Sequence, residues 1–360
     1  MIGPLVAALD APAYSLTQAQ RTPLLLDGLN ELTARHYAAG LPYRRIVDGA
    51  LGGLRPAAAV EDVPYLPVSL FKTQRLQSIA DEAVRVTLTS SGTTGQTVSR
   101  IVLDTDTSTI QQKALANSLV HVLGKRRLPM LVIDTGMVFK DPRRMSARGA
   151  GVLGLMRYGR SHAFALDPDL EPDVEAVRAF LAEHGDQPFF MFGFTFVVWM
   201  HFYERFRDSG IDLSNGILIH SGGWKKMVER SVDNATFRHA FKEAFGLTRI
   251  YNFYGMVEQI GSIFLEGPDG LLFPPNSADV IIRDPRSWQP LPPGQPGVIQ
   301  LLSLLPHSYP GHSVLTEDMG VVESVDPGID GWNGRGLRVL GRVAKAELRG
   351  CSDVIATAAA

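Results

Sequence analysis

Hydroxyl-bearing residues and glycines form an unbroken run at residues 90–95, Ser-Ser-Gly-Thr-Thr-Gly. Glycine loses much conformational entropy when it is ordered, and Ser and Thr bond readily to nearby backbone, so this composition favours a loop. A loop rich in N–H and O–H donors is suited to bind an anion such as phosphate. The run has neither the order of a Walker loop nor that of a GxGxxG fingerprint. Taken alone, a phosphate-binding loop and a plain hairpin tip are equally good interpretations.

Three further polar segments follow in the sequence. Gly-Gly-Trp at 222–224 lets a flat ligand approach the backbone and offers a ring for stacking. Asn-x-Tyr-Gly-x-x-Glu at 252–258 combines an amide, a ring and a carboxylate, which suit an adenine and Mg²⁺. Asp318 accepts two hydrogen bonds, as paired sugar hydroxyls require, and Arg342 offers a planar fork of donors. Each segment also has a purely structural interpretation: a strand-to-helix connection, a buried aromatic turn, or a surface ion pair.

Alternating strands and helices are expected to position these segments. Residues 1–63 are predicted to be mostly helical, with a stop at Gly40. Apolar and β-branched runs predict strands at 83–89, 99–104, 128–134, 187–194, 216–223 and 248–255. Helices are predicted at 107–124, 172–185, 196–210 and 234–246, and a glycine-rich turn at 141–156. After about residue 270 only short strands are predicted, at 278–284, 297–303 and 320–325, and residues 315–320 are interpreted as a turn.

This alternation predicts an α/β fold with largely parallel sheets flanked by helices, followed by a smaller β-rich subdomain. In α/β sheets, ligands bind beyond the carboxyl ends of the strands, and the polar segments follow predicted strands. They are therefore expected to converge on one site.

Composition narrows the class of protein. The 360 residues are 45% hydrophobic and 20% charged with a formal charge of −2, as in globular proteins, and no basic run with interleaved aromatics predicts nucleic-acid binding. The apolar stretch at 189–200 is shorter than the ~20 residues that span a bilayer, so no transmembrane segment is predicted. The N-terminus has no basic signal-peptide region, and a single cysteine excludes an internal disulfide framework. These features predict a cytoplasmic protein.

The order of the polar segments is more specific than any one of them. Ser-Ser-Gly-Thr-Thr-Gly, then Gly-Gly, Asn-x-Tyr-Gly-x-x-Glu, Thr-x-Asp and Gly-Arg resembles the adenylate-forming superfamily over roughly residues 64–351. That superfamily includes acyl-CoA ligases, luciferase and nonribosomal adenylation domains. Its members use ATP to convert a carboxylate into an acyl adenylate with release of pyrophosphate, and a thiol then takes the acyl group. The resemblance implies the fold of their N-terminal domain.

The same resemblance implies a role for each matching residue. The ATP phosphates would be held by Ser90, Ser91, Gly92, Thr93, Thr94 and Gly95. The adenine would be contacted by Gly222, Gly223, Trp224, Asn252, Tyr254 and Gly255. Glu258 would act in catalysis by binding Mg²⁺, and Asp318 and Arg342 would hold the ribose. One departure concerns the loop, which usually continues Gly-x-Pro-Lys: Val98 stands where the lysine is expected, and Arg100 is out of register.

Most members of the superfamily carry a further domain after the Gly-Arg hinge, with a catalytic lysine near its end. This chain ends at Ala360, so that domain is expected to be absent or vestigial. The expected organisation is a large domain at 1–340 (helical at 1–63, an α/β core at 64–269, β-rich at 270–340), followed by a hinge remnant and tail at 341–360.

The lone cysteine, Cys351, lies in that tail within Leu-Arg-Gly-Cys-Ser-Asp. Its thiolate, favoured by Arg349, could attack an acyl adenylate to form a thioester, although cysteine is more often a small buried hydrophobe. This layout, the segment VPYLPVSLFK at 63–72 and the form of the loop resemble the LuxE acyl-protein synthetase family of bacterial luminescence. That resemblance implies a fatty acid activated with ATP and Mg²⁺, loaded on the enzyme's own cysteine, and passed to a LuxC-like acyl reductase.

Two alternatives stay open. The chain could be an acyl-CoA ligase or a stand-alone adenylating enzyme that loads a carrier protein. It could also be a non-catalytic nucleotide-binding scaffold subunit, an alternative that the missing loop lysine keeps open. The apolar cluster at 192–199 is interpreted as core packing in preference to an acyl pocket.

Overall fold

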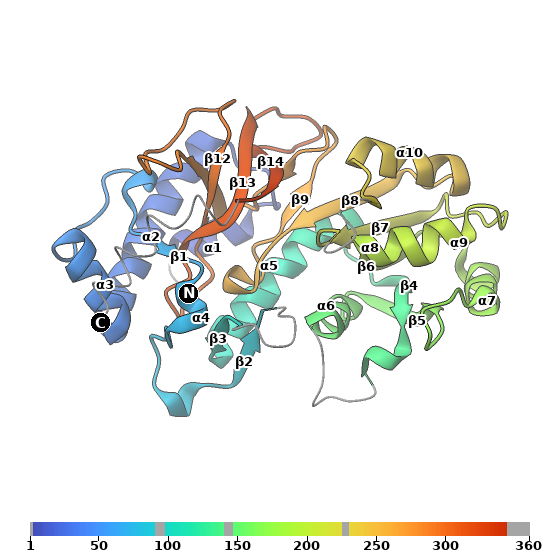
Figure 1. Cartoon of the computed structure of the whole chain (residues 1–360), viewed down its shortest axis with the longest axis horizontal. Coiled ribbons are helices and arrows are strands. Elements are labelled where there is room, and N and C mark those ends of the chain that lie inside the picture. The colour runs from blue at the N-terminus through green and yellow to red at the C-terminus, as the bar shows by residue number, and fades with distance from the viewer. Residues whose placement is uncertain (1–2, 91–97, 140–146, 225–229, 344–360) are drawn as a thin grey trace. The chain divides into compact units, whose positions relative to one another are not determined.

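The computed structural model describes residues 3–90, 98–139, 147–224 and 230–343, which form two compact units (Figure 1). The first unit, called here the antiparallel unit, draws on Met1–Ser118 and Gly255–Ala360. The second, called the parallel unit, comprises Leu119–Tyr254. The domain boundaries expected from the sequence stay a prediction.

Helices at the start of the chain cover the antiparallel unit. They are α1 (Gly3–Asp10), α2 (Gln18–Ala39) and α3 (Leu41–Leu51). Helix α2 begins with a capping box, because the Thr17 hydroxyl accepts from the Gln20 backbone while the Gln20 side chain accepts from the Thr17 backbone. It ends at Gly40, the stop that the sequence predicts. Helix α3 ends at Gly52, whose φ of 70° is the left-handed conformation that glycine tolerates best.

The sheet of this unit has the strand order β11-β12-β13-β14-β10-β9, and every neighbouring pair is antiparallel. Its strands are β9 (Phe264–Glu266), β10 (Leu272–Phe273), β11 (Ala278–Arg283), β12 (Gly297–Ser303), β13 (Ser313–Val325) and β14 (Arg335–Arg342). The short strand β1 (Leu66–Pro67) adds to β13 in parallel. A separate hairpin pairs β2 (Val86–Thr89) with β3 (Arg100–Leu103), and α4 (Leu70–Thr73) precedes it. Helix α5 (Thr105–Leu123) follows the hairpin.

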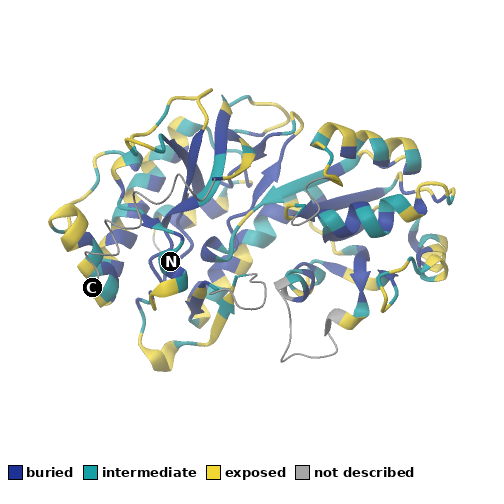
Figure 2. Cartoon of the chain, in the orientation of Figure 1, coloured by how far each residue is buried: buried dark blue, intermediate teal, exposed yellow. Residues whose placement is uncertain are grey.

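Two apolar clusters hold these elements together. In one, Leu25 and Leu29 of α2 pack with Ile281 of β11 and with Leu302. In the other, Phe71 of α4 packs with α3, β1, β3 and the segment that carries Met256 and Val257. Each fully buried side chain of this size contributes about 1.5–3 kcal/mol to stability. Figure 2 shows these strands as largely buried.

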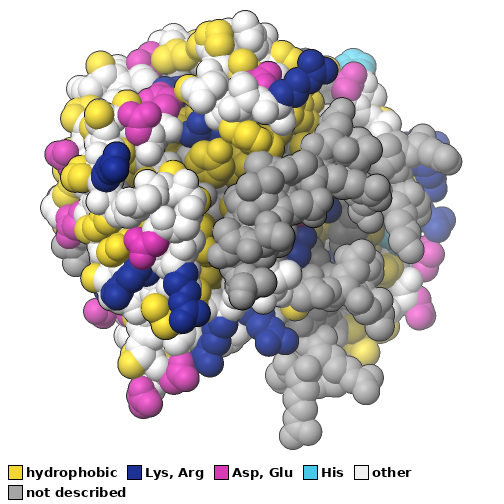
Figure 3. All heavy atoms as spheres, turned by 60° about the vertical axis from the view of Figure 1, so that its left-hand side comes forward, with side chains coloured by type: hydrophobic (Ala, Val, Ile, Leu, Met, Phe, Trp, Pro, Cys, Tyr) yellow, Lys and Arg dark blue, Asp and Glu magenta, His cyan; other side chains and the backbone are white. Residues whose placement is uncertain are grey.

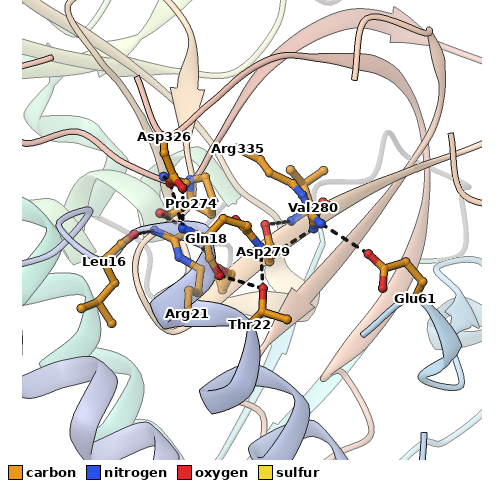
Figure 4. A network of polar contacts seen from close by, with 12 residues as sticks. Leu16, Gln18, Arg21, Thr22, Glu61, Pro274, Asp279, Val280, Asp326 and Arg335 are labelled. Carbon is orange, nitrogen blue, oxygen red and sulfur yellow. Dashed lines mark hydrogen bonds and ion pairs between the residues drawn. The ribbon is translucent and has the colours of Figure 1, made fainter. Parts of the chain in front are cut away.

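A polar network joins α2 to the sheet (Figure 4). The fully buried Arg21 guanidinium donates to the backbone oxygens of Leu16, Pro274, Ala278 and Asn333 at 3.1–3.4 Å. The buried carboxylate of Asp279 accepts from Gln18 at 2.6 Å and from Arg335 at 2.9 Å. Arg335 also donates to Glu61 at 3.3 Å. The Asp279 carboxylate is paired with Arg335, and the Arg21 guanidinium is hydrogen-bonded to four backbone oxygens, so these contacts offset part of the desolvation that burial imposes.

The parallel unit is a five-stranded parallel sheet in the order β8-β7-β6-β4-β5. The strands are β4 (Leu128–Thr135), β5 (Gly159–Leu166), β6 (Phe189–Phe194), β7 (Gly216–Ser221) and β8 (Arg249–Tyr254). Its helices are α6 (Ala147–Met156), α7 (Val174–His184), α8 (Thr195–Val197), a π-helical turn at Val198–Tyr203, α9 (Glu204–Phe206) and α10 (Asn234–Phe245).

Aromatic side chains dominate the core of the parallel unit. Phe237, Phe241 and Phe245 recur every fourth residue of α10, so they share one face of that helix. They pack against Phe202 and Trp199 of the neighbouring helical segment. Phe194, Phe196 and Trp199 of the apolar run at 192–199 pack in this core, which agrees with the interpretation of that run as mostly packing.

The predicted fold class is confirmed: a parallel sheet flanked by helices and a β-rich part are both present. Several local predictions were wrong, and strand β14 (Arg335–Arg342) was not predicted at all. Residues 315–320 lie inside the long strand β13 and not in a turn, because they pair with β12 and β14, with a bulge between Met319 and Gly320. Residues 147–156 form helix α6 where a turn was expected. Strand β5 was missed, because its first half, Gly-Arg-Ser-His, is mostly exposed at the edge of the sheet.

The described surface carries charges of both signs, as the near-neutral formal charge of −2 predicts. On the face drawn in Figure 3, Lys and Arg side chains are interspersed with Asp and Glu over the described residues. Among the described residues, no helix combines the length and apolar character needed to cross a membrane.

Candidate active site

Strands β2 and β3 pair as an antiparallel hairpin, and the sequence between them carries the serine- and glycine-rich loop. Of its six residues the structure describes only Ser90; Ser91, Gly92, Thr93, Thr94 and Gly95 lie outside the described residues. Ser90 and Ser99 close its base. The Ser90 N–H donates to the Ser99 carbonyl at 3.2 Å, and the Ser99 N–H donates to the Ser90 hydroxyl oxygen at 3.0 Å. This clamp fixes the two points between which the loop must run.

Glu258 lies on a 3-10 turn, Val257–Gln259, in the antiparallel unit. Two contacts hold the turn. The Tyr309 hydroxyl donates to the Glu258 carbonyl at 3.0 Å, and the Gln259 amide donates to Gly311 and Leu301 carbonyls at 2.9 and 3.1 Å. The Glu258 side chain is thus presented from a rigid support.

The environment of the Glu258 carboxylate is unusual for a charged group. Only 3% of the residue is exposed, and burial raises the pKa of its carboxyl group above the ordinary value. The side chain of Ser99 and the positive charge of Lys72 act in the opposite direction on this pKa, and the negative charge of Glu317 raises it further. A desolvated carboxylate of this kind gains more from a bound cation than an exposed one does.

Asp318 and Arg342 are directly opposite each other in the pairing of β13 with β14. Their side chains form a loose ion pair, with Arg342 Nε 3.8 Å from Asp318 Oδ1, and the Arg342 side chain is 81% exposed. Thr316 supports the strand, because its hydroxyl accepts from the Asp318 N–H at 3.1 Å and donates to the Ile299 carbonyl at 2.8 Å. The structure therefore brings together the two residues to which the sequence assigned a common ligand.

Lys72 and Glu317 belong to the same neighbourhood and were missed by the sequence analysis. Lys72 lies in the single turn of α4, and its Nζ lies 3.4 Å from Glu317 Oε2. The only signal in the sequence was the segment VPYLPVSLFK, which ends at this lysine. Ser99, which affects the Glu258 pKa, was missed as well.

A second group of predicted residues lies at the carboxyl ends of β7 and β8, in the parallel unit. Gly222 and Gly223 follow β7 and are exposed, and Gly222 has a φ of 87°. A Cβ on Gly222 would lie 3.2 Å from the Phe194 ring, which is a tight contact. Both this close approach and the positive φ favour glycine at this turn. Trp224 packs edge-on against Trp199, with ring centroids 6.1 Å apart.

Asn252 lies on β8, opposite His220 of β7, and Tyr254 is the last residue of that strand. His220 is buried and stacks on Phe237, and its Nδ1 is 3.0 Å from the Thr195 hydroxyl. Burial lowers the pKa of His220 to about 3, so its imidazole is neutral at physiological pH. The segment 252–258 crosses from one unit to the other, with Tyr254 in the parallel unit and Gly255 and Glu258 in the antiparallel unit.

The oxygen atoms of the described side chains could bind Mg²⁺ only together with oxygen atoms of a bound substrate. The described residues contain no group of three or more His, Cys, Asp or Glu side chains that could hold a metal ion. Mg²⁺ is commonly bound by one or two carboxylates together with the phosphates of a substrate. The single desolvated carboxylate of Glu258 matches that mode. Cys351 and Arg349 lie outside the described residues, so the acceptor thiol predicted from the sequence stays a prediction.

Comparison with solved structures gives the class of fold. A 2-hydroxyisobutyryl-CoA ligase in an open conformation superposes with a TM-score of 0.64 at 17% identity, covering 92% of this chain and 77% of that one. The same ligase in its postadenylation state superposes with a TM-score of 0.65 at 16% identity, covering 92% and 69%. The chain thus has the fold of the adenylate-forming ligases.

Sequence comparison gives the family. The family model described as acyl-protein synthetase, LuxE, matches residues 5–360, and the chain belongs to this family. A long-chain-fatty-acid–luciferin-component ligase of Vibrio harveyi is 25% identical over 346 residues, which is 93% of this chain and 87% of the relative. A ligase of the same name from Aliivibrio fischeri is 22% identical over 309 residues, or 81% and 78%. The family resemblance inferred from the ordered polar segments, and the enzyme class it implies, are confirmed.

Proposed function

We propose that this chain uses ATP and Mg²⁺ to convert a fatty acid into acyl-AMP, transfers the acyl group to Cys351 as a thioester, and delivers it to a LuxC-like acyl reductase. Family membership supports acyl-protein synthesis, and the names of the two bacterial relatives support a long-chain fatty acid. The observation that carries the proposal is the position of Glu258. Its buried carboxylate stands on the turn whose preceding residues, Met256 and Val257, pack in one cluster with Ile101 of β3, two residues after Ser99, and with Phe71, next to Lys72.

The residues of the antiparallel unit would bind the phosphates and the sugar. The loop at 90–95 would hold the phosphates, and the clamp between Ser90 and Ser99 would keep its ends in place. Glu258 would hold Mg²⁺, which when bound supplies positive charge to the phosphates. The Asp318 carboxylate would accept from the ribose hydroxyls, and Arg342 would donate to the same sugar.

The residues of the parallel unit would contact the adenine. The open turn at Gly222 and Gly223 has no side chain to obstruct a flat ring, and Trp224 and Tyr254 would offer aromatic faces. Asn252 would hydrogen-bond to the edge of the base. Support for this assignment is that β7 and β8 are adjacent parallel strands, so their carboxyl ends lie at one edge of the sheet.

The proposed chemistry needs no further reactant. An oxygen of the fatty-acid carboxylate attacks the α-phosphorus of ATP, the bond between the α- and β-phosphates breaks, and pyrophosphate leaves. The Cys351 thiolate then attacks the acyl carbonyl carbon, the bond from that carbon to the AMP oxygen breaks, and AMP leaves. The thiol proton passes to solvent. Residues 341–360 would serve as the hinge remnant and tail that carry the acceptor.

Pyrophosphate exchange tests the activation step by itself. The purified chain is incubated with ATP, Mg²⁺, labelled pyrophosphate and straight-chain fatty acids of increasing length. Label should enter ATP only when a fatty acid is present, and Cys351→Ser should exchange as well as the wild type because the thiol acts after adenylation. Absence of exchange with every acid would favour the scaffold alternative. Rapid discharge of the adenylate by coenzyme A would favour the acyl-CoA ligase alternative.

A further inference from the structure

The loop at 90–95 lacks the lysine that its resemblance to the adenylate-forming superfamily leads one to expect, because Val98 stands at that position. A nucleoside triphosphate carries several negative charges, and enzymes that act on it neutralise them with a metal ion and positively charged side chains. The question is which side chain of this unit supplies the missing positive charge. The answer concerns the proposed ATP site, so it rests on the proposed function.

The backbone before Lys72 is fixed to the strand that carries Asp318. Leu66 and Pro67 of β1 pair with Val314 and Leu315 of β13, and the Val68 N–H donates to the Leu315 carbonyl at 2.9 Å. Four residues after Val68 the chain reaches Lys72, on a single turn of helix. Lys72 is therefore held next to the Thr316–Glu317–Asp318 run by main-chain hydrogen bonds.

The same helical turn also packs against the other two parts of the candidate site. Phe71 is buried in a cluster with Ile101 of β3 and with Met256 and Val257, which precede Glu258. Helix α4 and the hairpin β2–β3 lie close together in Figure 1. Lys72 therefore lies near three elements: strand β3, which follows the loop in the sequence, the turn that carries Glu258, and strand β13.

The present contact of Lys72 is weak enough to be exchanged. Its Nζ is 3.4 Å from Glu317 Oε2, and the two side chains are 33% and 32% exposed. Ion pairs this exposed contribute only about 0–1 kcal/mol, so a phosphate can replace the carboxylate at little cost. The positive charge of Lys72 is also felt at Glu258, where it opposes the effect of burial on the pKa.

We propose that Lys72 is the phosphate-binding cation of this chain and replaces the absent loop lysine by contacting the β- and γ-phosphates of ATP. Arg100 is the nearest other cation in sequence, but its geometry is unsuitable. Side chains alternate along a strand, and Ile101 faces the apolar cluster. Arg100 is exposed, and this alternation places it on the opposite face of β3 from Ile101.

Binding of ATP and of AMP to a small set of variants tests the proposal. The variants are Lys72→Ala, Lys72→Arg, Glu317→Gln, Arg100→Ala and, as a matched control, Arg75→Ala, whose side chain is exposed and pairs with the exposed Asp81. Dissociation constants are measured for both nucleotides with Mg²⁺, and pyrophosphate exchange is measured alongside. AMP lacks the β- and γ-phosphates, so its binding also reports whether each variant is folded.

Lys72→Ala should bind ATP roughly 10- to 100-fold more weakly, as expected for loss of a charge-assisted hydrogen bond, and should bind AMP as the wild type does. Lys72→Arg should recover much of the ATP affinity. Glu317→Gln, Arg100→Ala and Arg75→Ala should bind both nucleotides normally.

Three results would overturn the proposal: Lys72→Ala that binds ATP like the wild type, equal weakening of ATP and AMP, or a Glu317→Gln variant that reproduces the Lys72→Ala defect. The last would mean that Lys72 acts only through its carboxylate partner. A wild type without pyrophosphate exchange, combined with the expected ATP defect of Lys72→Ala, would contradict the proposed function and leave the role of Lys72 standing.

Discussion

The backbone N–H of Ser99 donates to the hydroxyl oxygen of Ser90 at 3.0 Å, and this bond closes the base of the loop at 90–95. Ser99 is fully buried, so its N–H depends on this acceptor. The first serine of the loop therefore has a structural task in addition to the phosphate contact assigned to it.

Replacing Ser90 by alanine should remove that acceptor and leave a buried N–H unpaired. The expected cost is about 1–3 kcal/mol in the free energy of unfolding, measured by urea denaturation. Thr87→Val is the control, because it removes an exposed hydroxyl from the same hairpin and keeps a β-branched side chain. Equal stability of the two variants would contradict the clamp.

Glu258→Gln should separate activity from stability. If Glu258 holds the metal ion, loss of its charge removes several kcal/mol of transition-state stabilisation, and pyrophosphate exchange should fall by at least roughly 100-fold. The variant should be no less stable than the wild type at pH 7, since the buried carboxylate is costly to ionise. A variant that is active, or that unfolds at much lower urea, would be inconsistent with the assignment.

The direction of the Glu258 pKa shift also predicts a pH dependence. Because the folded-state pKa is raised above 4.5, this group favours the folded state below that pH, and its contribution is lost as pH rises through the raised value. Because kcat/KM reports the free enzyme, kcat/KM of exchange for ATP should fall, as pH is lowered, at a higher pH than an exposed glutamate would give. Glu258→Gln should lack this acidic limb in its residual activity.

The carboxylate of Asp279 is fully buried and 2.9 Å from Arg335, whose side chain is 20% exposed. Asp279→Asn should leave Arg335 poorly compensated and cost about 3 kcal/mol in the free energy of unfolding. Glu171→Gln is the matched control, because it breaks an ion pair with Arg205 in which both side chains are 54% exposed. That change should cost less than about 1 kcal/mol. Similar losses of unfolding free energy in Asp279→Asn and Glu171→Gln would show that burial does not determine how strongly an ion pair stabilises the fold.

Two buried histidines predict sensitivity of the antiparallel unit to acid. His312 Nε2 lies 2.9 Å from the Thr33 hydroxyl oxygen, and that hydroxyl donates to the Leu29 carbonyl at 2.7 Å. Nδ1 of His312 is buried with no hydrogen-bond partner among the described residues. His36 stacks on His312 at 5.0 Å. Burial lowers the pKa of His312 to about 3 and that of His36 well below its usual range.

A lowered histidine pKa means that the unfolded chain binds the proton more tightly. Stability is therefore full above about pH 6.5 and is lost as pH falls toward the folded-state pKa. Each histidine should cost on the order of 2 kcal/mol between pH 7 and pH 5. His312→Gln should show a shallower loss in urea titrations at these pH values, whereas substitution of the exposed His239 by Gln should leave the slope unchanged. Parallel slopes in His312→Gln and the wild type would exclude His312 as a source of the acid sensitivity.

Some of this site could be predicted from the sequence, and some could not. The strand-to-turn transition at Gly222 was predictable, because an apolar run ends there on two glycines. The shared location of Asp318 and Arg342 followed from a family resemblance, but their strand context did not. Local polarity at 315–320 suggests a turn, whereas pairing with two neighbouring strands makes the segment part of β13.

Lys72 and Ser99 could not be selected in advance. The contact of Lys72 with Glu317 joins residues 245 positions apart, and depends on the pairing of β1 with β13. The position of the Glu258 turn likewise depends on distant residues, because Tyr309 donates to Glu258 and the neighbouring Gln259 donates to Leu301 and Gly311. No local pattern encodes such contacts, since they arise only when distant segments pack together.

The central claim is that this chain activates a fatty acid and carries it on its own thiol. Intact-protein mass spectrometry after incubation with ATP, Mg²⁺ and a long-chain fatty acid tests it most directly. Cys351 is the only cysteine, so the account predicts one acyl group per chain that hydroxylamine removes, with none on Cys351→Ser. An unmodified wild-type chain that still exchanges pyrophosphate, or labile acylation of Cys351→Ser, would contradict it.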